Sequence, residues 1–360
     1  MAISAMSAHS SPKIRVLPAD YPAACIQAFM GQTSMTAATP LVIARCGDHP
    51  YGHFMGVSQA LGAFEGERLV GYVRGVVAPT QLLVGGELVT ESALYFGDLR
   101  IDDRQRRRGL AVALLDRLAE FARERGALRG YCYVNEGNDA MLRLLQAGKC
   151  RLQGKSVSQF ETASRLLPLK PLSTWRGHYQ QRPLSELQLG PLLQRRGEGI
   201  FSTVMTEDWL RSVGSVAGEQ LRCFAALDAP DTLAFALWDQ FDIRQLRLQT
   251  LDRSSAITLK VWRVLSGING GLAPPRRGEG FRMAELCWVA DDRIAQHPAA
   301  AIAAAWEMGV HILNLPVVGQ PPTGPLWQSL RTHVVAFAID GQGLPETHPA
   351  LPIIHDLGWI

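Results

Sequence analysis

The sequence predicts a two-domain protein of the α/β class, with mixed β-sheets flanked by helices (an α+β mixed sheet). The chain has 360 residues, longer than an ordinary single domain and long enough for two hydrophobic cores. Strand-like and helix-like segments follow one another in both halves. Between the halves, RLLPLKPLSTWRG carries two prolines and loses its periodicity, as linkers do. We therefore expect a disordered N-terminus over 1–12, a first domain over 13–165, a linker over 166–176 and a second domain over 177–360.

In the first half, apolar runs separated by glycines predict strands and hairpins. A strand over 13–18 and a helix near 21–31 come first, and ALGAFEGERLVGYVRGVV predicts two strands that meet at Gly66. QLLVGGELV predicts a second hairpin, with Gly85 and Gly86 at its tip, which leads into the strand ALYFGDLRI.

A long amphipathic helix follows this strand. Its apolar residues recur on one helical face, and Gly126 is placed to end it; they are Leu110, Leu114, Leu115, Leu118 and Phe121. A strand over 129–134, the turn NEGN and a helix over 139–148 come next, and the segment to about residue 163 predicts one or two closing strands.

The second half repeats this order more faintly. Helices are predicted over 206–218, 255–268 and 299–309, and strands over 221–228, 232–239, 244–251, 281–290, 311–318 and 334–340. A second α/β domain of similar size is the expected result.

Composition limits the classes of partner. There are 36 Lys+Arg against 33 Asp+Glu, and a net charge of +3 argues against a dedicated nucleic-acid binder.

The six cysteines include no C-x-x-C pair and no spacing suited to zinc, and His49 and His53 lie in a loop-like segment, so we expect no metal. The N-terminus does not resemble a signal peptide, and no apolar run is long enough to span a membrane. We expect a cytoplasmic protein with neither nucleic acid nor membrane as partner.

The segment RQRRRGLA, residues 104–111, lies between a strand and a helix. A helix start presents free backbone N–H groups at the positive end of the helix dipole, which favours an anion. Gly109 lets the main chain approach a phosphate closely, and the arginines add attraction. The alternative from the residues alone is a solvated helix start.

This region resembles a known signature. The run DLRIDDRQRRRGLAVALLDRLAEFARERG is similar to the pattern Gln/Arg-x-x-Gly-x-Gly/Ala of the GNAT acetyltransferase superfamily, and Arg106, Gly109 and Ala111 match it position by position. The resemblance in element order covers roughly 13–163, and the specific motif lies within 98–148. It implies a GNAT-type first domain that binds acetyl-CoA as co-substrate.

The resemblance also implies which residues hold the cofactor. Backbone groups at Leu99, Arg100 and Ile101 would contact the pantetheine arm. The pyrophosphate and the neighbouring turn would be contacted by Arg106, Arg107, Arg108, Gly109, Leu110, Ala111, Asn135 and Asn138.

The sequence departs from the family pattern after the motif. Many members carry a tyrosine that protonates the leaving thiolate, and Leu144 stands at that position here. The usual Asn-x-x-Ala is displaced, because Gly137 lies three residues before Ala140. These changes leave the general acid open.

Acetyl transfer to an amine needs a base for the amine and an acid for the leaving thiolate. Asp98 is the preferred carboxylate, with pairing to an arginine as the alternative role, and Tyr95 is a candidate acid or water-orienting group. Tyr131 and Tyr133 could approach the thiol, although aromatics on strands more often belong to a core.

The second half has no such motif at its candidate strand-to-helix turn, where Asp291 and Asp292 would repel a pyrophosphate. We expect a degenerate second GNAT-like domain, and an N-acetyltransferase whose acceptor is a small-molecule amine or a protein amine. A homodimer stays open. The rival hypotheses are a non-catalytic acyl-CoA-binding regulatory module, and a nucleic-acid binder that uses RQRRR as a phosphate patch.

Overall fold

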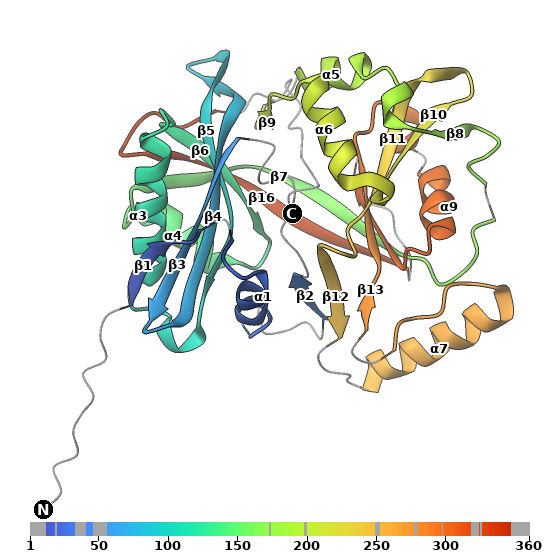
Figure 1. Ribbon diagram of the computed structural model, residues 1–360, viewed down its shortest axis with the longest axis horizontal. Helices are drawn as coiled ribbons and strands as arrows, with labels where there is room; N and C mark the ends of the chain where they lie inside the picture. The colour runs from blue at the N-terminus through green and yellow to red at the C-terminus, as the bar shows by residue number, and fades with distance from the viewer. Residues whose placement is uncertain are drawn as a thin grey trace, which may run out of the picture.

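The protein, seen in a computed structural model, is a mixed α/β structure organised around one long β-sheet (Figure 1). The structure describes residues 12–18, 20–32, 41–45, 56–172, 174–197, 200–248, 253–276, 279–296, 298–317, 324 and 326–346. Within these residues the large sheet has 13 strands and a separate sheet has three. This architecture confirms the predicted fold class. The expected disordered N-terminus, His49 and His53 lie outside the described residues, apart from residue 12.

The first half supplies one edge of the large sheet and the helices that cover it. Its elements are β1 (Lys13–Val16), α1 (Ala23–Gln32), β2 (Leu41–Arg45), β3 (Val57–Glu65), β4 (Arg68–Val84), β5 (Glu87–Ile101), the 3-10 turn η1 (Asp103–Gln105), α3 (Leu110–Arg123), β6 (Arg129–Asn135), α4 (Asp139–Gln146) and β7 (Leu152–Leu166).

The glycine turns predicted from the sequence are confirmed. β3 and β4 meet at Gly66, whose φ is +62°. β4 and β5 are joined through Gly85 and Gly86 at φ +60° and +82°. Two successive positive φ angles are what a tight two-residue hairpin requires, and glycine adopts them without steric cost.

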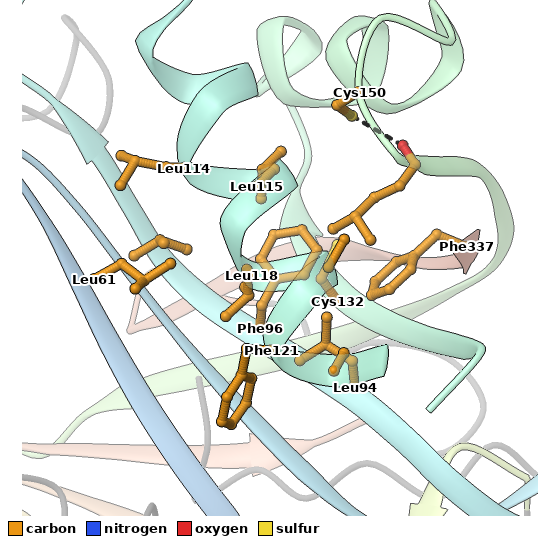
Figure 2. Packing of buried hydrophobic residues seen from close by; sticks show 14 of the residues in the cluster. Leu61, Leu94, Phe96, Leu114, Leu115, Leu118, Phe121, Cys132, Cys150 and Phe337 are labelled. Atoms are coloured by element: carbon orange, nitrogen blue, oxygen red, sulfur yellow. Dashed lines mark hydrogen bonds between the residues drawn. The ribbon is translucent and has the colours of Figure 1, made fainter. Parts of the chain in front are cut away.

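α3 packs its apolar face on the sheet and forms the main core of the first half. Leu114, Leu115 and Leu118 are fully buried, and Figure 2 shows them beside Leu94 and Phe96 of β5. A Cβ at Gly75 would lie 2.5 Å from Leu118 Cδ1, so glycine on β4 permits this close contact between helix and sheet. The same figure shows Phe337, which belongs to the far end of the sequence.

The second half supplies the opposite edge of the large sheet. Its elements are β8 (Tyr179–Arg182), η2 (Leu184–Glu186), α5 (Gly190–Gly197), β9 (Ser202–Thr203), α6 (Glu207–Ala217), η3 (Gly218–Gln220), β10 (Leu221–Ala226), β11 (Ala229–Asp239), β12 (Arg244–Leu248), α7 (Arg253–Asn269), β13 (Gly280–Phe281), β14 (Met283–Cys287), α8 (Asp292–Gln296), α9 (Ala299–Glu307), β15 (Ile312–Pro316) and β16 (Trp327–Ile339).

The two halves repeat one strand arrangement and exchange their last strands. The order is β1-β3-β4-β5-β6-β16-β7-β15-β14-β11-β10-β8, with β5 parallel to β6 and β14 parallel to β15. β16, from the end of the chain, pairs with β6, and β7 pairs with β15. β7 and β16 pair with each other along their whole length at the centre of the sheet. Figure 1 shows this long pair crossing the middle of the molecule.

The exchange buries the apolar face of β16 in the core of the first half. Val335, Phe337 and Ile339 alternate along the strand, are at most 1% exposed, and belong to the core beneath α3. The predicted linker near 166–176 therefore does not separate two sheets, and the domain boundaries stay a prediction. The small sheet also joins the halves, because β2 pairs with β12.

Candidate active site

The parallel strands β5 and β6 pair only briefly and then separate. Their register runs from Ala93 opposite Arg129 to Tyr95 opposite Tyr131. Beyond that point β5 continues to Ile101 and β6 to Asn135, with no pairing between them. The carboxyl ends of these strands therefore open beside the starts of α3 and α4. Ligands of α/β sheets commonly bind at such carboxyl ends.

A bulge in β5 accompanies the separation. Opposite β4, the register moves from Arg74 with Gly97 to Tyr72 with Arg100, which leaves one extra residue on β5. Asp98 lies in this bulge with φ +60°. β-bulges bend a strand and increase its twist, which turns the end of β5 away from its neighbour.

The loop that follows β5 has a fixed base. The Asp102 carboxylate accepts from the Arg104 backbone N–H and from Arg68, both at 2.9 Å. Gln105 is 4% exposed, and its amide donates to Glu65 at 3.2 Å. These bonds tie the loop to the β3–β4 hairpin, so its backbone is held in place before any ligand binds.

The loop ends in a row of backbone N–H groups that have no acceptor. Within the described chain, no hydrogen bond is made by the amides from Arg107 to Val112. Arg107 and Gly109 have φ angles of +62° and +78°, and no side chain caps α3 at Gly109. The first turn of α3 also lacks an acidic residue. Free amides at a helix start form a site for an anion.

The predicted arginines differ in their partners. Arg106 forms an ion pair with Asp103 at 2.6 Å, and Arg108 donates to the Gln105 side chain at 3.4 Å. Arg107 makes no ion pair with the described part of the chain. All three are exposed. Gly109 has open space around its Cβ position, with no atom within 4 Å, so the approach to the amides is clear.

The other predicted cofactor residues line the same opening. Leu99, Arg100 and Ile101 form the end of β5, on the edge that no described strand covers. Leu110 and Ala111 start α3. The two asparagines already have structural roles: Asn135 accepts from Thr332 of β16 at 3.2 Å, and Asn138 caps α4 at the Met141 amide.

Tyr95 and Asp98 lie on β5 near the point of separation. The Tyr95 ring contacts Tyr131 and Tyr133, with centroids 5.4 and 5.6 Å apart. A Cβ on Gly97 would lie 3.4 Å from the Tyr95 hydroxyl oxygen, so this hydroxyl lies beside the part of β5 that leaves β6. Asp98 is half-buried in the bulge.

The second half contributes to this aromatic cluster, which sequence analysis did not predict. Phe201 is completely buried, and its ring lies 5.6 Å from Tyr131. Phe160 of β7, in the first half, completes the cluster with its ring 5.4 Å from that of Tyr133. The short strand β9 beside Phe201 pairs with Thr80 and Gln81 of β4. Local sequence carries no signal for contacts between residues so far apart along the chain.

Other side chains near the site are unreactive. Cys132 of β6 is buried on the α3 face, and burial raises the pKa of its thiol far above the ordinary range. Leu144 of α4 packs against the same core and presents an aliphatic side chain. The described residues contain no cluster of His, Cys, Asp and Glu suited to a metal ion.

The corresponding place in the second half is built differently. β14 and β15 pair from Met283 to Glu285, and Trp288 follows with φ +51°. The segment between β14 and α8 has no glycine, and Asp291 there accepts hydrogen bonds from Tyr179 and Arg293. A carboxylate at this position opposes binding of a phosphate.

The mixed sheet and the opening between β5 and β6 define an α/β fold with a candidate ligand site at the carboxyl ends of two parallel strands. Residues 24–148 match the model of the acetyltransferase (GNAT) family. This stretch of the chain is therefore similar to the GNAT family, as its motif implied. Comparison with curated proteins gives no sequence match.

Solved structures of similar fold include N-myristoyltransferase from Saccharomyces cerevisiae. With bound myristoyl-CoA it aligns over 94% of this chain and 80% of its own at 8% identity, with a TM-score of 0.59. A structure of the same enzyme with myristoyl-CoA and inhibitors covers 91% and 80% at 10% identity, with a TM-score of 0.58. These similarities extend across both halves of the chain and concern the fold.

The described residues include no helix long and apolar enough to cross a membrane.

Proposed function

We propose that this protein transfers an acyl group from acyl-CoA to an amine. The observation that carries the proposal is the row of free amides from Arg107 to Val112 beside the opened ends of β5 and β6. This arrangement offers donors to a pyrophosphate and an uncovered strand edge to a pantetheine arm. The GNAT family match over the same residues supports it.

The chemistry requires three groups. The amine nitrogen forms a bond to the thioester carbonyl carbon, the carbon–sulfur bond breaks, and the CoA sulfur leaves as a thiolate that takes up a proton. A backbone N–H on the open edge of β5 can polarise the carbonyl. We assign the proton donor to the Tyr95 hydroxyl, because it lies beside Gly97 at the point where the strands separate. Asp98 is proposed to accept the proton that the amine loses.

The proposed donor is acetyl-CoA, and a longer acyl-CoA is the alternative raised by the N-myristoyltransferase similarity. The proposed acceptor is a small-molecule or protein amine. A second candidate function is a non-catalytic acyl-CoA-binding module, which Leu144 on α4 favours because this aliphatic side chain cannot protonate a thiolate.

The test combines binding with turnover. Acetyl-CoA and myristoyl-CoA are titrated by calorimetry, and each is then incubated with a panel of amines while released CoA thiol is measured and the acylated product is identified by mass spectrometry. Amine-dependent thiol release supports the enzyme. Saturable binding without release for any amine supports the regulatory module, and absence of binding contradicts both functions.

A further inference from the structure

α7 exposes an apolar stripe along its solvent side. Five aliphatic residues spaced by three or four positions, and so on one helical face, are between 37% and 73% exposed: Ile257, Val261, Val264, Leu265 and Ile268. A surface helix of a globular protein ordinarily turns such a stripe inward. The helix lies at the lower right of Figure 1, at the periphery of the second half.

The opposite side of α7 is fixed to the protein. Trp262 is 5% exposed and packs with Phe281, Met283 and Ile312, and its indole N–H donates to the Leu272 carbonyl at 2.7 Å. Ser266 is also buried. Turning the stripe inward would expose Trp262, so the outward orientation belongs to the folded protein.

The charge on α7 has one sign. The helix carries Arg253, Lys260 and Arg263, all exposed, and no acidic residue. None of the three forms an ion pair with the described part of the chain. Because Lys260 lies three and four residues from Ile257 and Val264, it flanks the apolar stripe directly.

We propose that α7 docks the protein on the surface of an anionic lipid bilayer, with the stripe in the interface and the basic residues against the headgroups. A helix that combines an exposed apolar face with flanking Lys and Arg fits this environment. A second copy of the chain fits less well, since a two-fold contact between α7 helices would bring their basic residues together. The proposal is independent of acyl transfer, and it departs from the expectation of no membrane partner.

The experiment is co-sedimentation of the full chain with vesicles of phosphatidylcholine alone and of phosphatidylcholine with phosphatidylserine. We expect binding to the anionic vesicles that weakens at least ~10-fold when Ile257 and Ile268 are both changed to Ser. The matched control is Val216→Ser in α6 with Leu227→Ser in the turn after β10; these residues are 56% and 50% exposed, and the variant should bind like the wild type.

A second pair of variants tests the charge. Lys260→Glu with Arg263→Glu should weaken binding to anionic vesicles at least ~10-fold, because the anionic surface attracts each basic residue and repels its acidic replacement. Lys13→Glu with Lys155→Glu changes the net charge equally at exposed sites elsewhere and should leave binding unchanged.

Three results would overturn the proposal. The wild type could fail to sediment with anionic vesicles, or the α7 variants could bind as the wild type does. The third result concerns the protein without vesicles, studied by sedimentation velocity. If the wild type is a dimer and the variant with Ile257→Ser and Ile268→Ser is a monomer, a second copy of the chain covers the stripe.

Discussion

Replacing Gly109 by Glu is the most direct perturbation of the candidate CoA site. The position has φ +78°, where any L side chain costs roughly 1–2 kcal/mol of backbone strain. No atom lies within 4 Å of its Cβ position, so the new side chain meets no steric clash. Its carboxylate would lie among the free amides of the loop and occupy the place proposed for a phosphate.

The size of the effect follows from the charge. Two like charges about 4 Å apart repel by roughly 1 kcal/mol in water and about 4 kcal/mol at a dielectric constant near 20. Calorimetric titration of acyl-CoA should therefore give a dissociation constant raised by ~5-fold to ~1000-fold. The folded protein should lose little stability, because a carboxylate at the start of α3 interacts favourably with the helix dipole.

Two controls separate charge from strain. Gly86→Glu places the same residue at φ +82° with open space around it, on the β4–β5 turn at the opposite end of β5 from the loop, and should leave affinity unchanged. Gly109→Ala keeps the strain without the charge and should weaken binding much less than Gly109→Glu. An affinity of Gly109→Glu within threefold of the wild type would refute the assignment of the phosphate site.

Further predictions concern catalysis, packing and pH. Tyr95→Phe should lower kcat about 100-fold or more with little change in KM for acyl-CoA, measured by thiol release, and an unchanged kcat would leave Tyr95 only a packing role. Phe337→Ala should reduce the free energy of unfolding by about 3–5 kcal/mol in urea, with Phe337→Leu much milder, and a loss below about 1 kcal/mol would contradict the shared core. Burial lowers the pKa of His311 from its ordinary value of 6.5, and its Nδ1 accepts from the Arg282 amide at 3.1 Å. The neutral ring is thus favoured in the folded state, so its contribution to stability is complete above pH 6.5 and is lost as the pH falls through the folded pKa. Unfolding measured from neutral pH to about pH 5 should show a smaller loss for His311→Gln than for the wild type.

The parts of the fold that the sequence predicted correctly depend on local chemistry. The leucine spacing from Leu110 to Leu118 determines which face of α3 is buried, and the glycine pairs determine where the hairpins turn. The glycine at the start of α3 was predictable for the same reason, because Gly109 and the helix start are neighbours in sequence, while its role in an anion site stays a prediction.

Contacts between distant segments were not predictable in this way. The alternating apolar residues of β16 predict a strand, but they do not indicate which sheet this strand joins. Its insertion between β6 and β7 is decided by long-range pairing, which a local pattern does not encode. The periodicity of α7 likewise predicted a helix without indicating that its aliphatic stripe faces solvent.

The exchanged strands change what the second half contributes to the site. Phe337 of β16 contacts Phe96 of β5 at a centroid distance of 5.3 Å, directly after the last residue that β5 pairs with β6. Phe201 contacts Tyr131 from the other face of the sheet. The strands that form the proposed acyl-CoA opening are therefore held on both faces by residues from beyond position 177. A half that lacks the phosphate loop itself can still be required for binding, because it completes the sheet on which that loop is built.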